Sequence, residues 1–121
     1  MKAATWEMVN KRRAAEGRAT FAFRPCVFCP QIAREYAADW LRMLCARFCS
    51  ETGREPSVAE LYAYWNLGPD KFQSLGYELS RVCAAARRAA FAVEAAVDAA
   101  TERELNARAE RLIATRPGGG Q

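Results

Sequence analysis

The stretch that decides the fold runs from residue 57 to residue 79 and reads SVAELYAYWNLGPDKFQSLGYEL. Ser57 and Glu60 stand three residues apart, as in the capping box, in which each side chain accepts a hydrogen bond from the backbone of the other. A helix over 58–65 is therefore expected. The following NLGPD turn at 66–70 predicts a second helix, because Asn and Gly tolerate left-handed backbone and Pro suits a first helical position.

Apolar spacing across this stretch indicates two helices that contact each other at a steep angle. The contacts would come from Leu61, Trp65, Leu67, Phe72 and Leu75. This pattern resembles the helix-turn-helix of bacterial winged-helix regulators and of sigma factors. Asn66 stands where that motif usually has a left-handed Gly, whereas Tyr62 replaces the Ala that usually allows close approach of the helices. The resemblance covers about a fifth of the chain.

The resemblance implies a small DNA-binding transcriptional regulator whose second helix enters the major groove. The side chains expected to face base edges are Lys71, Gln73, Ser74 and Tyr77. Those expected on phosphates are Lys11, Arg12, Arg13 and Arg81. On the outward side of the second helix, however, Asp70 and Glu78 balance the two basic residues, which weakens phosphate neutralisation.

The same helix pair also fits a second class of function, a protein-binding adaptor or inhibitor such as a phage or mobile element encodes. A neutral second helix favours this alternative, and Tyr62, Tyr64 and Tyr77 would then act as aromatic anchors. The chain has a net charge of +4, and the excess lies in its N-terminal half, which favours DNA.

Upstream, the sequence predicts a central helix over 30–51, which begins at Pro30 and ends before Gly53. Its apolar residues recur every fourth position, at Ile32, Tyr36, Trp40, Leu44 and Phe48. A shorter helix is expected over 4–16. Residues 19–24 would form either one edge strand or a loop held by Phe21 and Phe23.

Downstream of residue 70 the sequence contains no proline until the tail, and the segment 84–100 is rich in alanine. A helix reaching residue 113 would be about 65 Å long, wider than a small domain. Its distal half must fold back, with a break near 100–104 as one route, or pack on another chain. A homodimer through this C-terminal helix is the expected assembly.

These patterns predict a mostly α-helical fold. It would have four to five helices, a helix-turn-helix core, a long Ala-rich C-terminal helix and at most one short strand. Residues 1–115 would form a single helical domain, followed by a flexible tail at 116–121.

Composition excludes several classes of protein. Hydrophobic residues make up 51% of the 121 residues and charged residues 26%, which excludes a wholly disordered chain. The absence of histidine removes Ser-His and Cys-His catalysis, so no enzyme and no catalytic cofactor are expected. No apolar run suits a membrane span or a signal peptide, so a cytoplasmic protein without membrane contact is expected.

Four of the five cysteines follow the spacing C-x2-C-x15-C-x3-C at positions 26, 29, 45 and 49, which is typical of a four-thiolate zinc site. A straight helix from 30 to 51 would hold Cys29 and Cys45 about 24 Å apart, too far for one ion. Any zinc is therefore expected on Cys26 and Cys29 alone. The alternative is a loop with two half-buried thiols, while Cys45 and Cys83 fit as small core residues.

Overall fold

The computed structural model describes residues 1–115 of the chain. It is 78% helical with six α-helices, the last of them long, and residues 1–115 contain no strand. The mostly α-helical class is thus confirmed. Contacts divide the chain into two compact units, Met1–Pro56 (unit 1) and Ser57–Gln121 (unit 2). A single domain over 1–115 stays a prediction, and the predicted tail at 116–121 lies outside the described residues.

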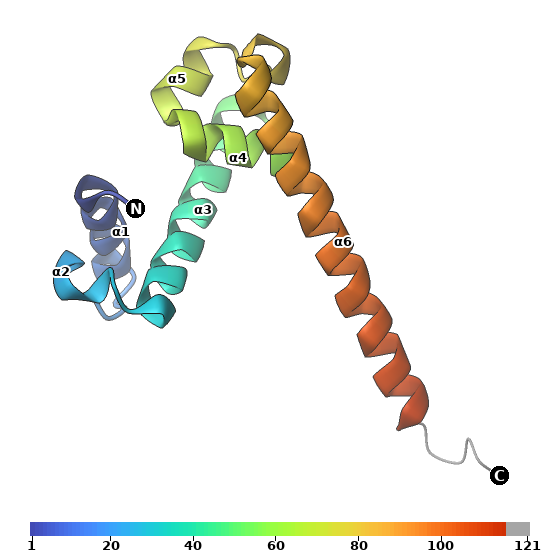
Figure 1. The fold of residues 1–121 in the computed structure, drawn as a ribbon. Helices are drawn as coiled ribbons and strands as arrows, with labels where there is room; N and C mark the ends of the chain where they lie inside the picture. Colours follow the sequence, from blue (N-terminus) through green and yellow to red (C-terminus); the bar gives the residue numbers. More distant parts are fainter. Residues whose placement is uncertain (116–121) are drawn as a thin grey trace. The chain divides into compact units, whose positions relative to one another are not determined.

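Unit 1 is built on two helices, α1 (Ala3–Ala15) and α3 (Pro30–Thr52), which lie against each other (Figure 1). Both match the predicted ranges to within one residue at each end. Gly53 ends α3 in the left-handed conformation, with φ 76°. Trp6 of α1 stacks on Tyr36 of α3 with ring centroids 3.7 Å apart, and both rings are fully buried. Aromatic packing therefore joins the two helices.

The segment between α1 and α3 holds the one-turn helix α2 (Phe23–Cys26) and no strand, so the expected strand at 19–24 is wrong and the loop alternative is right. Side chains from both long helices fix this loop at Phe21. Its carbonyl accepts hydrogen bonds from Trp6 Nε1 at 2.9 Å and Asn10 Nδ2 at 3.0 Å. Its N–H donates to the Tyr36 hydroxyl at 2.9 Å. With its backbone groups satisfied by side chains, the segment needs no strand partner.

Unit 2 begins with α4 (Val58–Leu67), and its predicted capping box is present. The Glu60 N–H donates to Ser57 Oγ at 3.1 Å, and the Ser57 N–H donates to Glu60 Oε1 at 2.9 Å. A single residue, Gly68 with φ 89°, separates α4 from α5 (Pro69–Ser74).

The chain breaks between α5 and the long C-terminal helix, far upstream of the predicted break at 100–104. Gly76 and Tyr77 take positive φ values of 69° and 58°, a left-handed pair that no helix can continue through. The 3₁₀ turn η1 (Leu79–Arg81) follows, and α6 (Ala84–Ala114) then runs for 31 residues without interruption. The periodicity of 72–82 suggested one continuous helix and missed this turn.

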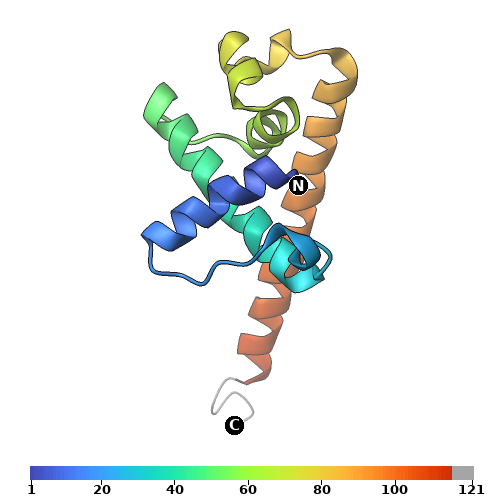
Figure 2. The same cartoon turned by 90° about the vertical axis from the view of Figure 1, so that its left-hand side faces the viewer.

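The proximal part of α6 packs on α4, whereas its distal half, defined here as residues 95–115, extends away from α4 and α5 in both views (Figures 1 and 2). Ala90 is fully buried. Glu94 accepts a hydrogen bond from the Ala59 N–H at 3.0 Å, which places a carboxylate at the positive end of the α4 dipole. Among the helices described for this chain, none combines the length and apolar character needed to cross a membrane.

Candidate functional site

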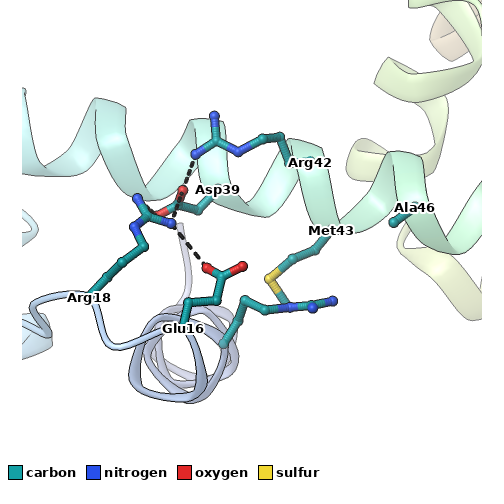
Figure 3. Close-up of a pocket in the computed structure, with 7 residues that line it drawn as sticks. Glu16, Arg18, Asp39, Arg42, Met43 and Ala46 are labelled. Carbon is teal, nitrogen blue, oxygen red and sulfur yellow. Dashed lines mark hydrogen bonds and ion pairs between the residues drawn. The ribbon is translucent and has the colours of Figure 1, made fainter.

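In unit 1, the carboxylate of Asp39 on α3 accepts hydrogen bonds from the guanidinium groups of three arginines. Arg13 of α1 donates from Nη1 to Oδ2 at 2.5 Å, and Arg18 donates to both carboxylate oxygens at 3.0 and 3.3 Å. Arg42, one turn further along α3, also donates to Oδ1. Figure 3 shows Arg18 and Arg42 meeting at Asp39, with Glu16 beside Arg18. The cluster therefore ties α1, the following loop and α3 together.

Asp39 remains ionised although its side chain is only 3% exposed. Burial by itself would raise the pKa of this carboxyl, but the hydrogen bonds from Arg13, Arg18 and Arg42 outweigh it and hold the pKa below its ordinary value. This burial is possible because Arg13 of α1 and Arg18 of the following loop pair with the carboxylate.

Arg13 is also displaced from its predicted role on phosphates. It is 5% exposed, and its Nε donates to the Ala19 carbonyl at 2.6 Å. Its guanidinium lies over the Tyr36 ring, 4.7 Å from the centroid. A side chain that is buried and saturated in this way is a structural element of unit 1 and is not presented to a nucleic acid. The signal in the sequence for this burial is the helical spacing of Trp6, Val9 and Arg13, which puts all three on one side of α1.

A shallow pocket of about 200 Å³ opens over the Asp39 cluster (Figure 3). Its lining consists of Arg12, Glu16, Arg18, Asp39, Arg42, Met43 and Ala46. Arg42 is 66% exposed and keeps donors directed away from Asp39, and Arg12 has no ion-pair partner within residues 1–115. The arginines that line this pocket can bind a small anion, although the carboxylates of Glu16 and Asp39 already neutralise much of their charge.

Two of the predicted phosphate-contacting residues, Lys11 and Arg12, are exposed on α1. In unit 2, the predicted base-reading residues Lys71, Gln73 and Ser74 are all exposed on α5. Arg81 is exposed and pairs with Glu78 at 3.2 Å. The structure thus brings three base-reading candidates onto one helix, but that helix has only six residues.

Two of the predicted tyrosine contacts belong to the interior of unit 2. Tyr64 is fully buried, and its ring meets that of Tyr77 edge-to-face with centroids 5.8 Å apart. Phe72 meets Tyr77 in the same way at 5.6 Å. The hydroxyl oxygens of Tyr64 and Tyr77 are both shielded from solvent. Burial corrects the predicted protein-binding role of Tyr64 and the base-reading role of Tyr77, because these rings close the α4–α5 corner.

The remaining tyrosine, Tyr62, lines a shallow hollow of about 210 Å³ together with Trp65 and Asn66. Trp65, expected among the contacts between α4 and α5, is 41% exposed, so that contact stays a prediction.

The cysteines do not gather into one site. Since α3 is one helix from 30 to 52, the predicted separation of Cys29 from Cys45 is confirmed. Cys26 and Cys29 are half-buried in the loop before α3, and the Cys29 N–H donates to the Cys26 carbonyl at 3.0 Å. Burial raises the pKa of the Cys45 thiol, with smaller contributions from Cys49 and Glu55. Residues 1–115 contain no group of three or more potential metal ligands. Zinc on Cys26 and Cys29 stays a prediction.

One surface whose residues the sequence did not identify lies on the distal half of α6. Every residue from 95 to 115 is exposed except Ala107, which is half-buried. Large apolar side chains nevertheless occur there. Their exposed fractions are 41% for Val97, 56% for Leu105, 72% for Leu112 and 75% for Ile113. We call these four residues the α6 apolar face. The spacing of Val97, Leu105 and Leu112 is the signal in the sequence that indicates this surface.

Comparison with known proteins adds no family assignment: no family model, no curated protein and no solved structure matches the chain.

Proposed function

We propose that the chain is a protein-binding adaptor, and that the distal half of α6 is the surface that contacts its partner. One observation carries the proposal, namely the exposure of four large apolar side chains along the distal half of α6, which no described residue of its own unit covers. Solvent exposure of one such residue is ordinary, whereas an aligned series on a projecting helix is typical of helix-in-groove and helix-pair recognition.

Helix energetics support the same proposal. In proteins, most helical stability comes from packing of an amphipathic side, and intrinsic propensity contributes less. The proximal part of α6 has that packing at Ala90 and Val93, which are buried and half-buried. The distal half lacks it within unit 2. A partner helix would supply the missing burial, at about 25 cal/mol for each Å² of apolar surface removed from water.

The geometry of the α6 apolar face fits a helical partner. At 3.6 residues per turn, each residue advances by about 100°, so Val97, Leu105 and Leu112 project within one quarter of the helix circumference. Ile113 projects about 80° beyond Leu105, and Asn106 lies beside it. The side opposite Leu105 carries Arg103 and Glu110. One side is thus apolar and the other polar, as in helices that bind along their length.

Site-specific photocrosslinking in cells tests this function. The photoreactive residue p-benzoylphenylalanine would replace Leu105, and a control would carry it at Arg103, an exposed position that projects about 160° away from Leu105. We expect a protein adduct from position 105 and none from position 103. Adducts from neither position, or equal adducts from both, would contradict a specific docking surface on α6.

DNA binding is the second candidate function, and one observation favours it: Lys71, Gln73 and Ser74 are exposed together on α5. Four other features disfavour DNA binding. They are the six-residue length of α5, the buried hydroxyl of Tyr77, the Glu78–Arg81 pair and the burial of Arg13. An anisotropy titration with duplex DNA at low salt tests this candidate. Duplex binding that Gln73→Ala weakens by about 1–3 kcal/mol at one sequence would support direct readout, and no binding at micromolar protein would end the candidate.

A further inference from the structure

The loop before α3 carries two thiols in a single turn, and we propose that they form a redox-active dithiol that exchanges with small-molecule disulfides. The pair consists of Cys26, the last residue of α2, and Cys29, the N-cap residue of α3. Both are free thiols and both are half-buried. The site lies within unit 1 and is independent of the α6 apolar face.

The backbone of this turn brings the two thiols within the reach of one disulfide bond. The Cys29 N–H donates to the Cys26 carbonyl at 3.0 Å, and the Phe28 N–H donates to the Pro25 carbonyl at 3.0 Å. A hydrogen bond between residues i and i+3 closes a turn whose end Cα atoms lie less than about 7 Å apart. Disulfides span Cα separations of about 4.4–6.8 Å. The turn therefore suits a Cys26–Cys29 bond.

Helix α3 carries a second pair of cysteines, and its geometry holds them apart. Cys45 and Cys49 are separated by one helical turn, and both are half-buried like the first pair. Residues i and i+4 of a helix have Cβ atoms about 5–6 Å apart, whereas a disulfide needs about 3.5–4.5 Å. A Cys45–Cys49 bond would require α3 to unwind. The chain thus contains an internal control with the same degree of burial.

The surroundings of the Cys26–Cys29 turn suit a disulfide substrate that carries carboxylates, such as glutathione disulfide. Phe28, between the two cysteines, is 75% exposed, so the turn lies at the surface. Arg34 is exposed, and its Nε donates to the Pro30 carbonyl at 3.3 Å. This bond places a guanidinium beside the residue that follows Cys29. The first turn of α3 contains no acidic residue that would repel the substrate.

The reaction is thiol–disulfide exchange in two steps. One cysteine of the pair loses its proton to solvent, and its thiolate attacks a sulfur of glutathione disulfide, so that a mixed disulfide forms and one glutathione thiolate leaves. The thiolate of the second cysteine then attacks the protein sulfur of the mixed disulfide and releases the second glutathione. Two protein thiols become one disulfide, and one glutathione disulfide becomes two glutathione thiols. Two electrons and two protons thus pass from the protein to glutathione.

Incubation of the reduced full-length protein with glutathione disulfide, followed by acid quenching and peptide mass spectrometry, tests the site. We expect a Cys26–Cys29 disulfide to accumulate and no Cys45–Cys49 disulfide to form. The exposed Cys83 should gain a glutathione adduct, which reports that the reagent has reacted with the protein. Cys26 and Cys29 remaining as thiols while Cys83 is modified, or a Cys45–Cys49 bond that forms as readily, would overturn the inference.

Single variants test the second step of the exchange. Cys26→Ser and Cys29→Ser each leave one thiol of the pair without its neighbour. The glutathione adduct on the remaining cysteine should then be at least about tenfold more abundant than on the same cysteine in wild type, where the neighbouring thiol acts at high effective concentration. Cys83→Ser, outside the pair, is the control and should keep the wild-type pattern. Equal adduct levels in wild type and in both pair variants would show that neither thiol displaces glutathione, contrary to the inference.

Discussion

The two units stabilise their helices in different ways. Unit 1 joins α1 to α3 through the Trp6–Tyr36 stack and, unlike unit 2, also through buried polar groups. Arg13 pairs with Asp39, and Phe21 exchanges hydrogen bonds with Trp6, Asn10 and Tyr36. Unit 2 relies on an aromatic corner and on small residues that let α4 approach α6. In unit 2 the last 20 residues of α6 and Thr115 are almost fully exposed, and the helices of unit 1 have no comparable stretch.

This contrast suggests where function lies. Buried charge pairs are costly to form, and removal of one partner is more costly still, so the residues that make them are committed to the fold. Exposed apolar side chains make no such contribution to the folded unit. The basic residues of unit 1 that a DNA-binding role would use are thus partly committed, while the α6 apolar face remains available to a partner.

The largest expected effect follows from removing the buried Asp39 carboxylate, which pairs with Arg13 in unit 1. Asp39→Ala leaves the Arg13 guanidinium buried without its carboxylate, and we expect a loss of about 3–5 kcal/mol in the free energy of unfolding. Arg42→Ala is the matched control, because this partner is 66% exposed and should cost below about 1 kcal/mol. Urea titration followed by tryptophan fluorescence measures both, since Trp6 and Trp40 are buried in this unit. Equal losses for the two variants would contradict the role given to burial.

Acidification should remove part of the same stabilisation. The pKa of Asp39 lies below its ordinary value of 3.8 in the folded chain, because three arginines bind its charged form. A depressed folded-state pKa gives stability that is present above the unfolded value and lost as pH falls through the folded value. We therefore expect the free energy of unfolding to fall below about pH 4. Asp39→Asn should show a shallower fall, and identical acid profiles for variant and wild type would count against this cluster.

A smaller effect is expected at the start of unit 2. Ser57→Ala removes one half of the capping box and leaves the Glu60 N–H without its side-chain acceptor. The expected cost is about 1 kcal/mol. Ser57→Asp is the matched variant, since its carboxylate can accept the same hydrogen bond and should restore most of the loss. Amide exchange in α4 provides the measurement, and failure of Asp to exceed Ala would show that the cap is not the cause.

The smallest expected effect is on the free chain when the α6 apolar face is altered. Leu105→Ser changes a side chain that is 56% exposed, so at low protein concentration the free energy of unfolding should change by less than about 0.5 kcal/mol. A loss of several kcal/mol in dilute monomer would mean that Leu105 packs within its own chain. The α6 apolar face would then be a core surface.

Local signals predicted most of the helices. Pro30 and Gly53 marked α3, and the Ser57–Glu60 box marked the start of α4. Local signals did not predict features that depend on contacts between residues far apart in the sequence. Burial of Asp39 depends on Arg13, which lies 26 residues away. The left-handed conformation of Tyr77 accompanies its packing on Tyr64 and Phe72, and no periodicity encodes it.

The candidate surface could be predicted only in outline. The length of the C-terminal helix indicated that part of it needs a partner, and the structure confirms the long helix. The position of α4 on α6 decides which side of α6 stays uncovered. This contact joins separate helices, so the local sequence pattern does not encode it. For the DNA-binding prediction, the outward residues of 70–81 were assigned as if they belonged to one helix, whereas α5 ends at Ser74.

Amide hydrogen exchange of the full-length protein at low concentration tests the central claim most directly. If the distal half of α6 is a docking surface that its own chain leaves uncovered, amides of residues 95–115 should exchange rapidly in dilute protein. Their exchange should be at least about tenfold faster than in the proximal part of α6, which packs on α4. Protection of residues 95–115 as strong as that of the proximal part would contradict the account.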